Sequence, residues 1–290
     1  MLRTDPPLVP GLSALATDYD ALVCDVWGVL HNGLAAHPTA CAALVEYRRQ
    51  GGRVVLLTNA PRPSGPIHQQ LASLGVPREA YDDLVTSGDV TRATLMARPE
   101  RRIAHVGPER DLPIYADLPH SLVGDAEAEI VVCSGLVDDL TETPDDYRAR
   151  LSAMAERGLA MLCANPDLIV ERGEDKVWCA GALAKLYAED FGGEVTLIGK
   201  PHAPVYAEVR RRIAALLGRP ADDRRLLAIG DGLPTDIRGA VAQGLDVLFV
   251  TGGIHAADFG SVEAPDPAIV AARLAAEGLA ATAMLPRLVW

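Results

Sequence analysis

The stretch YDALVCDVWGVL, residues 19–30, carries a continuous apolar run that ends at the carboxylate of Asp25. A run in which apolar and polar residues do not alternate is typical of a parallel strand that is buried on both faces. Helical patterns separate this run from later ones, so strands and helices alternate along the chain. The sequence therefore predicts an α/β fold with a doubly wound parallel sheet. The later runs are residues 53–58, 129–134, 159–164, 194–199, 225–231 and 245–253.

Helix patterns with ordinary start and stop residues fill the intervals between these runs. Pro38 opens the first of them, and the pair Gly51-Gly52 closes it. The alanine-rich tail from Val270 to Ala283 predicts a closing helix. The other expected helices are residues 38–50, 65–74, 145–157, 180–191 and 203–217.

Residues 98–178 differ in composition from the rest of the chain. They carry several prolines and acidic residues between strand and helix signals of their own. We interpret this segment as an inserted second domain, because the length of 290 residues suits one α/β domain with an insertion. The predicted core then consists of residues 1–97 and 179–290.

Composition limits the class of protein and its partners. A net charge of −12 repels polyanions, and no dense basic cluster offsets it, so nucleic acid is not an expected partner. No run of about 18 apolar residues suggests a membrane span, and the N-terminus lacks the apolar stretch of a secretory signal. We therefore expect a cytoplasmic protein without membrane association. The five cysteines have no CxxC spacing and are expected to be reduced and buried.

Polar residues follow several of the predicted strands. Asp25 follows the first run and Thr58-Asn59 ends the second, while Lys200 follows the run at 194–199. In open α/β sheets, ligands bind outside the carboxyl ends of the strands. Each of these residues taken alone is also compatible with an ordinary turn or a surface loop.

The segment AIGDGLPTD, residues 228–236, is the most specific of these signals. It places the carboxylates of Asp231 and Asp236 around a glycine-containing turn after a buried strand. Hard cations such as Mg²⁺ prefer oxygen ligands and retain several waters, so two or three carboxylates suffice to hold one.

Taken together and in this order, these segments resemble the four motifs of the haloacid dehalogenase superfamily. The likeness is greatest to its class IIA branch, the p-nitrophenyl-phosphatase-like and NagD-like proteins. The resemblance extends over nearly the whole chain and implies a core with an inserted α/β cap of type II. Further stretches that carry it are residues 86–89, 165–167, 181–182 and 199–201.

The resemblance also implies a role for each matching residue. Asp25 would be the nucleophile that forms an aspartyl-phosphate, and Thr58 with Asn59 would hold the phosphoryl group. Lys200 would neutralise nucleophile and phosphate. Asp231 and Asp236 would hold Mg²⁺ together with Asp25 and the main-chain carbonyl of Trp27. The implied partner is a small phosphorylated metabolite. Phosphoryl transfer requires in-line positioning and charge stabilisation, which these groups could supply.

Trp27 departs from the family pattern. Phosphatases of the superfamily carry at this position a second aspartate that acts as general acid and base, a role that an indole cannot fill. Three explanations are open. The enzyme could act on substrates with good leaving groups, or use His31, His202 or a substrate group instead. It could be a phosphate-metabolite-binding or regulatory protein, or it could be a dehalogenase, because metal-free dehalogenases of the superfamily also carry an aromatic residue there.

Substrate choice would fall to the inserted segment, which the resemblance describes as a cap. Asn165 and Asp167 lie where the branch places substrate-facing residues, although Asn-Pro-Asp is also a common turn. Gly28, Gly33 and Gly232 are expected to turn the backbone tightly beside the phosphate. No recognition motif names the substrate. Relatives often pair through their caps, so a homodimer is a further expectation.

Overall fold

The computed structural model describes residues 2–172 and 175–290, which divide into two compact units. The first unit comprises the chain up to Thr58, His68–Val85 and Tyr206–Trp290. The second comprises Asn59–Ile67 and Thr86–Val205. The predicted insertion, 98–178, lies inside the second unit, apart from residues 173 and 174, which lie outside the described residues. The unit is therefore larger than that insertion.

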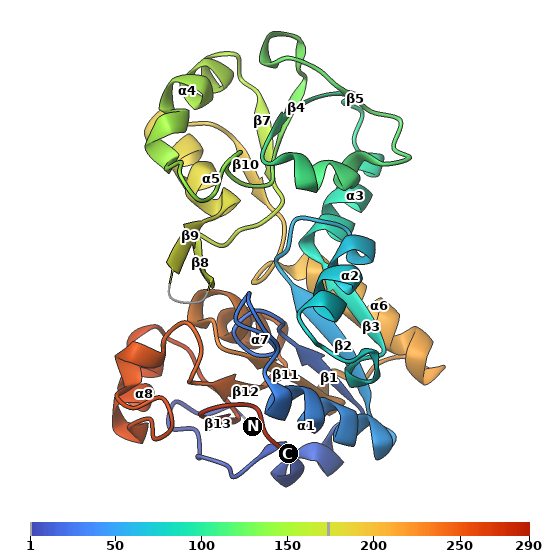
Figure 1. Cartoon of the computed structure of the whole chain (residues 1–290), viewed down its shortest axis with the longest axis vertical. Coiled ribbons are helices and arrows are strands. Elements are labelled where there is room, and N and C mark those ends of the chain that lie inside the picture. Colours follow the sequence, from blue (N-terminus) through green and yellow to red (C-terminus); the bar gives the residue numbers. More distant parts are fainter. Residues whose placement is uncertain (1, 173–174) are drawn as a thin grey trace. The chain divides into compact units, whose positions relative to one another are not determined.

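A six-stranded sheet in the order β13-β12-β11-β1-β2-β3 forms the first unit. Strand β1 pairs in parallel with β11 on one side and with β2 on the other. The register places Cys24 of β1 beside Ile229 and Leu56. Figure 1 shows α1, α7 and α8 around this sheet, as expected for an α/β fold. Its strands are β1 (Ala21–Cys24), β2 (Arg53–Thr58), β3 (Asp83–Thr86), β11 (Leu226–Gly230), β12 (Asp246–Val250) and β13 (Ala283–Leu285).

The second unit has a sheet of its own, with five strands in the order β10-β7-β6-β4-β5 and parallel pairing throughout. Strands β8 (Ile169–Arg172) and β9 (Asp175–Trp178) pair antiparallel in a separate two-stranded sheet. Helices α3, α4 and α5 belong to this unit (Figure 1). The strands of the sheet are β4 (Arg102–Val106), β5 (Ser121–Leu122), β6 (Ile130–Cys133), β7 (Ala160–Cys163) and β10 (Val195–Leu197).

Most expected helices are present, and their ends follow from local sequence. Helix α5 ends at Gly192, which adopts the left-handed conformation that glycine tolerates, with φ of 66°. The helix expected from Val270 to Ala283 is present only as far as Ala276, so its predicted C-terminal part is wrong. Helix α8 ends at Ala276, because Gly278 takes φ of 66° there, and Ala283 begins β13. The helices are α1 (Pro38–Arg49), α2 (Ser64–Ser73), α3 (Ser87–Ala97), α4 (Arg148–Glu156), α5 (Ala180–Phe191), α6 (Ala203–Leu217), α7 (Arg238–Gln243) and α8 (Pro267–Ala276).

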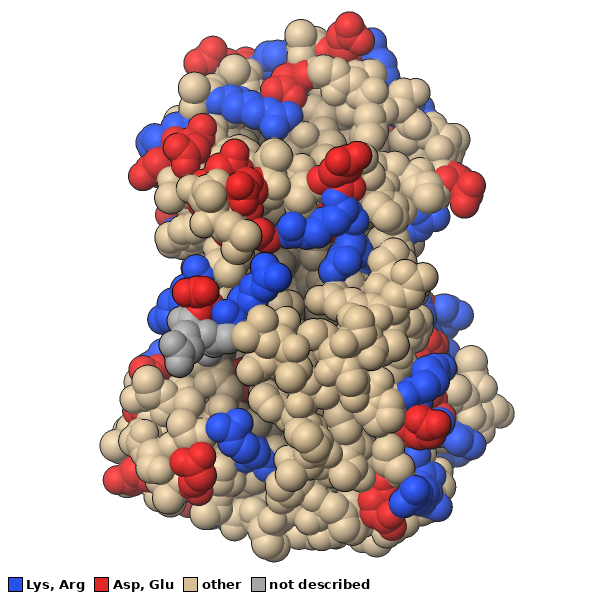
Figure 2. Space-filling model, viewed as in Figure 1, with Lys and Arg blue, Asp and Glu red and all other residues tan. Residues whose placement is uncertain are grey.

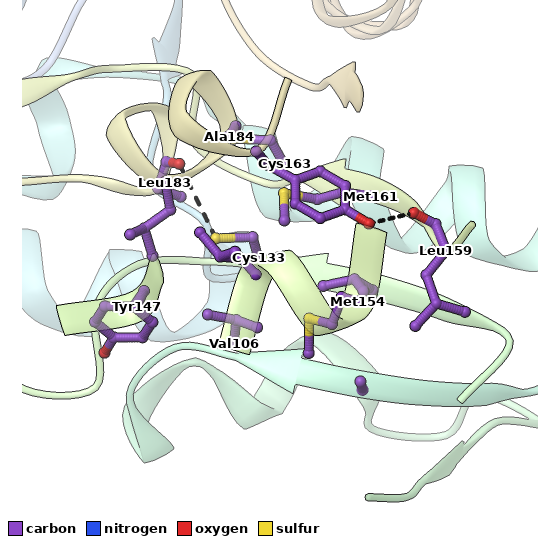
Figure 3. Packing of buried hydrophobic residues seen from close by; sticks show 14 of the residues in the cluster. Val106, Cys133, Tyr147, Met154, Leu159, Met161, Cys163, Leu183 and Ala184 are labelled. Atoms are coloured by element: carbon purple, nitrogen blue, oxygen red, sulfur yellow. Dashed lines mark hydrogen bonds between the residues drawn. The ribbon is translucent and has the colours of Figure 1, made fainter. Parts of the chain in front are cut away.

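Buried side chains from β6, β7, α4 and α5 form one core of the second unit (Figure 3). Cys133 and Cys163 face each other across the β6–β7 pair, and both are fully buried. The Tyr187 hydroxyl donates to the Leu159 carbonyl at 2.6 Å, which satisfies the polar end of a fully buried ring. All five cysteines are free and buried, which confirms the sequence expectation. Burial raises the pKa of the Cys133 thiol to about 12, so it stays protonated at neutral pH.

Several charged side chains on the second unit are paired with opposite charges. On the face drawn in Figure 2, acidic and basic groups lie side by side on this unit. Arg150 contacts Asp125 at 2.8 Å, and Arg148 contacts Asp190 at 2.7 Å.

Among the described residues, no helix is both long enough and apolar enough to cross a membrane.

Candidate active site

Three neighbouring strands of the first unit end in polar residues at the same edge of the sheet. Asp25 directly follows β1, Thr58 is the last residue of β2, and Asp231 directly follows β11. The main-chain N–H of Asp25 donates to the Ile229 carbonyl at 2.8 Å, which continues the β1–β11 pairing by one residue. Because β1 lies between β2 and β11, parallel pairing places these three positions at neighbouring strand ends of one edge.

Asp236 joins this group from the π-helical turn Leu233–Ile237 that follows β11. One carboxylate oxygen each from Asp25, Asp231 and Asp236 lies within 4.8 Å of the other two. All three residues are buried, with exposures of 6%, 4% and 6%. Single π-helical turns of this kind are frequent at functional sites.

The chemistry of this donor set fits a hard divalent cation. Three carboxylates buried together repel one another and lose hydration, which is costly without a compensating charge. Oxygen ligands from two or three carboxylates, completed by water, are what Mg²⁺ takes in proteins. The described residues could therefore hold such an ion through Asp25, Asp231 and Asp236.

Two loops fix the carboxylate of Asp231 from both sides. The N–H of Ile254 donates to Asp231 Oδ2 at 2.8 Å, and a Cβ at Gly253 would lie 1.9 Å from that oxygen. On the other loop, a Cβ at Gly28 would lie 2.2 Å from it. The contacts of Gly253 and Ile254 were not anticipated from the sequence. The glycine pair Gly252-Gly253, which ends the run at 245–253, is the signal that could have pointed to them.

The expected glycine turns are confirmed at two positions and wrong at the third. Gly28 and Gly33 adopt φ of 85° and 84°, in the left-handed region. Gly232 instead has φ of −84°, which any residue can adopt. A glycine is needed at position 232 for lack of space, because a Cβ there would lie 2.2 Å from Thr235 Oγ1. The Gly232 N–H also donates to Asp236 Oδ2 at 3.1 Å, which orients that carboxylate.

Trp27 and His31 lie together in the loop after β1. Their rings meet edge to face with centroids 5.0 Å apart. The Gly33 N–H donates to His31 Nδ1 at 3.0 Å, so the proton of the neutral imidazole lies on Nε2. Burial, with a smaller contribution from His37, lowers the pKa of His31 to about 4, so the ring is neutral at pH 7.

The remaining predicted site residues form one network inside the second unit. Asn59 Nδ2 donates to Asp167 Oδ1 at 2.9 Å and to the Lys200 carbonyl at 3.3 Å. The Lys200 N–H donates to Asn59 Oδ1 at 2.7 Å. The Asp167 N–H donates to Asn165 Oδ1 at 3.0 Å, which is the side-chain turn expected of Asn-Pro-Asp. The amide of Asn59 is thus engaged on both its nitrogen and its oxygen.

Lys200 and Asn59 are both 4% exposed, and Gly199 allows the loop between β10 and Lys200 to pack closely. A Cβ at Gly199 would lie 2.6 Å from Asn59 Oδ1 and 2.6 Å from Pro166 Cδ. Burial lowers the pKa of the neighbouring His202, which is half-buried. Lys200 is therefore fixed through its main chain to Asn59.

Comparisons with known proteins agree with this arrangement. Residues 22–118 match the family model described as haloacid dehalogenase-like hydrolase, and residues 197–276 match one described as HAD-hydrolase-like. A solved hydrolase of the haloacid dehalogenase-like family from Brucella suis 1330 is 46% identical, with a TM-score of 0.87 over 97% of this chain and all of that one. The chain belongs to the haloacid dehalogenase superfamily. It is a hydrolase of that superfamily, and its core and second sheet match the fold.

Two further relatives place this haloacid dehalogenase hydrolase in the NagD-like class IIA branch. Ribonucleotide monophosphatase NagD of Escherichia coli K12 is 25% identical over 82% of this chain and 89% of its own. A glycerol phosphate phosphatase from Mycobacterium tuberculosis, solved with magnesium, is 25% identical with a TM-score of 0.66. That similarity extends over 87% of this chain and 74% of the phosphatase.

Proposed function

We propose that this hydrolase releases phosphate from small phosphorylated metabolites through an aspartyl-phosphate on Asp25, with Mg²⁺ as cofactor. The observation that carries the proposal is the meeting of three buried carboxylates, Asp25, Asp231 and Asp236, at the carboxyl edge of the sheet beside Thr58. Relatives described as phosphatases, one of them solved with magnesium, support the reaction class and the metal.

Each residue has a task in this scheme. The carboxylate of Asp25 would attack phosphorus as the bond from phosphorus to the leaving oxygen breaks, and water would then hydrolyse the aspartyl-phosphate to release phosphate and restore the carboxylate. The Thr58 hydroxyl and the main-chain N–H of Asn59 hold the phosphoryl oxygens, since the Asn59 side chain is engaged by Asp167 and Lys200. Lys200 supplies the compact positive charge that the resemblance assigns to it.

Asp25, Asp231 and Asp236 would hold the magnesium ion, with the carbonyl of Trp27 as a further oxygen ligand. The ion, when bound, neutralises charge on nucleophile and phosphate. Asn165 and Asp167 remain proposed substrate-facing residues. Their contacts also give them a structural role, because Asn165 and Asp167 form a turn from which Asp167 accepts a hydrogen bond from Asn59.

Trp27 favours substrates that need little protonation of the leaving group, such as acyl or aryl phosphates. The indole N–H can donate a hydrogen bond but is far too weak an acid to protonate a leaving oxygen, and His31, neutral with its proton on Nε2, is also a weak acid. The same residue favours a second candidate function, a phosphate-metabolite-binding or regulatory protein with little turnover. In that case the carboxylate cluster would still bind metal and ligand.

A release assay separates the two functions. The protein is incubated with acetyl phosphate, p-nitrophenyl phosphate and a sugar phosphate, with Mg²⁺ and with a chelator. Hydrolysis should be fastest for acetyl phosphate and should disappear in chelator. If no phosphate is released from any substrate while Mg²⁺ and phosphate still bind, the hydrolytic proposal fails and the binding function stands.

Gly28→Ala is expected to weaken Mg²⁺ binding by about tenfold or more. The added Cβ would lie 2.2 Å from Asp231 Oδ2, and φ of 85° strains a residue other than glycine by about 1–2 kcal/mol. Gly51→Ala is the matched control, because Gly51 also has positive φ, 94°, but a Cβ there would meet nothing within 4 Å. Titration calorimetry measures both. Equal Mg²⁺ affinities for the two variants would contradict the placement of the metal at Asp231.

A further inference from the structure

A cavity of about 220 Å³ lies in the first unit, outside the carboxylate cluster. Four separate segments line it: the loop after β1, the start of α1, and the loops that follow β12 and β13. None of the lining residues is acidic, whereas two, His37 and Arg287, are basic. The volume is several times that of one water molecule, which occupies about 30 Å³ in the liquid. The cavity can therefore admit a small ion.

Among the described residues of this unit, Arg287 is the arginine for which no hydrogen bond or ion pair is found. Within the described part of the first unit, every other arginine forms a hydrogen bond or ion pair, most often with an aspartate or glutamate. Arg287 forms none there, although the chain carries a net charge of −12 and acidic residues are abundant. Its guanidinium donors are therefore available to a ligand, which would replace water there.

The lowered pKa of His37 indicates that the positive charge of Arg287 acts on the lining of the cavity. Burial and then the positive charge of Arg287 lower the pKa of His37, which is half-buried. Thr39, also on the lining, adds a hydroxyl that can donate to an oxygen. The lining thus combines an arginine that forms no ion pair with a described residue, an imidazole and a hydroxyl, and these groups are complementary to a small oxyanion.

We propose that this cavity binds a small oxyanion of the phosphate class, held by the Arg287 guanidinium with His37 and Thr39 beside it. The ligand would form charge-assisted hydrogen bonds with the planar guanidinium, which suits the geometry of phosphate and carboxylate oxygens. This site is distinct from the phosphoryl site proposed at Asp25, and it needs no metal.

The walls of the cavity are also the loops that hold Asp231. Gly28 lines the cavity on one side and packs against Asp231 Oδ2 on the other. Gly252 lines it as well, directly before Gly253 and Ile254, which contact the same oxygen. An anion in this cavity thus lies behind the two loops that orient a proposed metal ligand.

The test is a calorimetric titration of the intact protein with inorganic phosphate in the presence of a chelator. Without metal, binding at the carboxylate cluster is suppressed, and one phosphate per chain should still bind. Arg287→Gln should weaken this binding by about tenfold, the loss expected for a hydrogen bond to a charged group. Arg287 is exposed, so the variant should fold, and an unchanged melting temperature checks this.

Two control variants locate the binding. Arg224→Gln removes an exposed arginine that pairs with Asp222 elsewhere in the unit, and Lys200→Met removes the lysine of the proposed phosphoryl site. Both should bind phosphate in chelator as the unaltered protein does. The proposal is overturned if the unaltered protein binds no phosphate in chelator or binds chloride equally well. It is also overturned if Lys200→Met abolishes the binding or if Arg287→Gln leaves it unchanged.

Discussion

Asp25→Asn is expected to lower the rate of phosphate release by about 10³-fold or more, because the amide cannot attack phosphorus to form the acyl-phosphate bond. The substitution keeps the shape of the side chain and removes one of the three charges of the carboxylate cluster. It should therefore reduce kcat with acetyl phosphate without unfolding the first unit. Steady-state assays and a thermal melt measure the two effects separately.

Asp222→Asn is the matched control for this loss. Asp222 belongs to the same unit but pairs with exposed Arg224 before the start of β11, not at the carboxyl ends of the strands. This variant should keep the full rate. If Asp25→Asn retained more than about a tenth of the activity, Asp25 would not be the nucleophile and the carboxylates would serve only to bind the metal.

Trp27→Asp is expected to raise the rate with alkyl phosphates by about 10²–10⁴-fold, the usual contribution of a positioned general acid and base. The metal site should survive, because position 27 would contribute only its main-chain carbonyl. Acetyl phosphate should gain little, since its leaving group needs no proton. The ratio of the two rates is the measurement.

Trp27→Asn separates proton transfer from the removal of bulk. The asparagine has the size of aspartate but no titratable proton, and both variants lose the ring contact with His31. We expect no gain with alkyl phosphates for this variant. A similar gain in both variants would mean that the indole acts by blocking the substrate, and the account of a missing proton donor would be wrong.

The sequence predicted the parts of the site that depend on strand ends. Asp25, Thr58 and Asp231 each follow a continuous apolar run, and parallel pairing brings such positions to one edge whatever the details of the loops. The α/β class and the superfamily were predicted correctly for the same reason. The catalytic roles of these residues stay predictions, as do the domain bounds at 98–178 and the pairing of two copies.

Features that depend on contacts between distant segments were not predictable. The N–H of Ile254 reaches Asp231 only because β12 lies beside β11 in the sheet. Likewise, Arg287 lines a cavity with His37 although 250 positions separate them, and no local pattern marks either residue. Strand β5 was missed because two residues are too few for periodicity to indicate a strand.

The C-terminal tail was predicted to be helical up to Ala283, whereas the helix ends at Ala276 and a strand begins at Ala283. Alanine favours helix wherever nothing opposes it, and the tail is rich in alanine. The left-handed turn at Gly278 stops α8, and pairing with β12 then draws Ala283 into the sheet. Tertiary pairing therefore overrode the local preference.

Identification of the phosphorylated residue during turnover tests the central claim most directly. The protein is mixed with acetyl phosphate and Mg²⁺, quenched in acid within the turnover time, digested and analysed by mass spectrometry. We predict one added phosphoryl group on the peptide that contains Asp25, absent in chelator and in Asp25→Asn. A phosphoryl group on another residue, or none on Asp25 while phosphate is being released, would contradict the account.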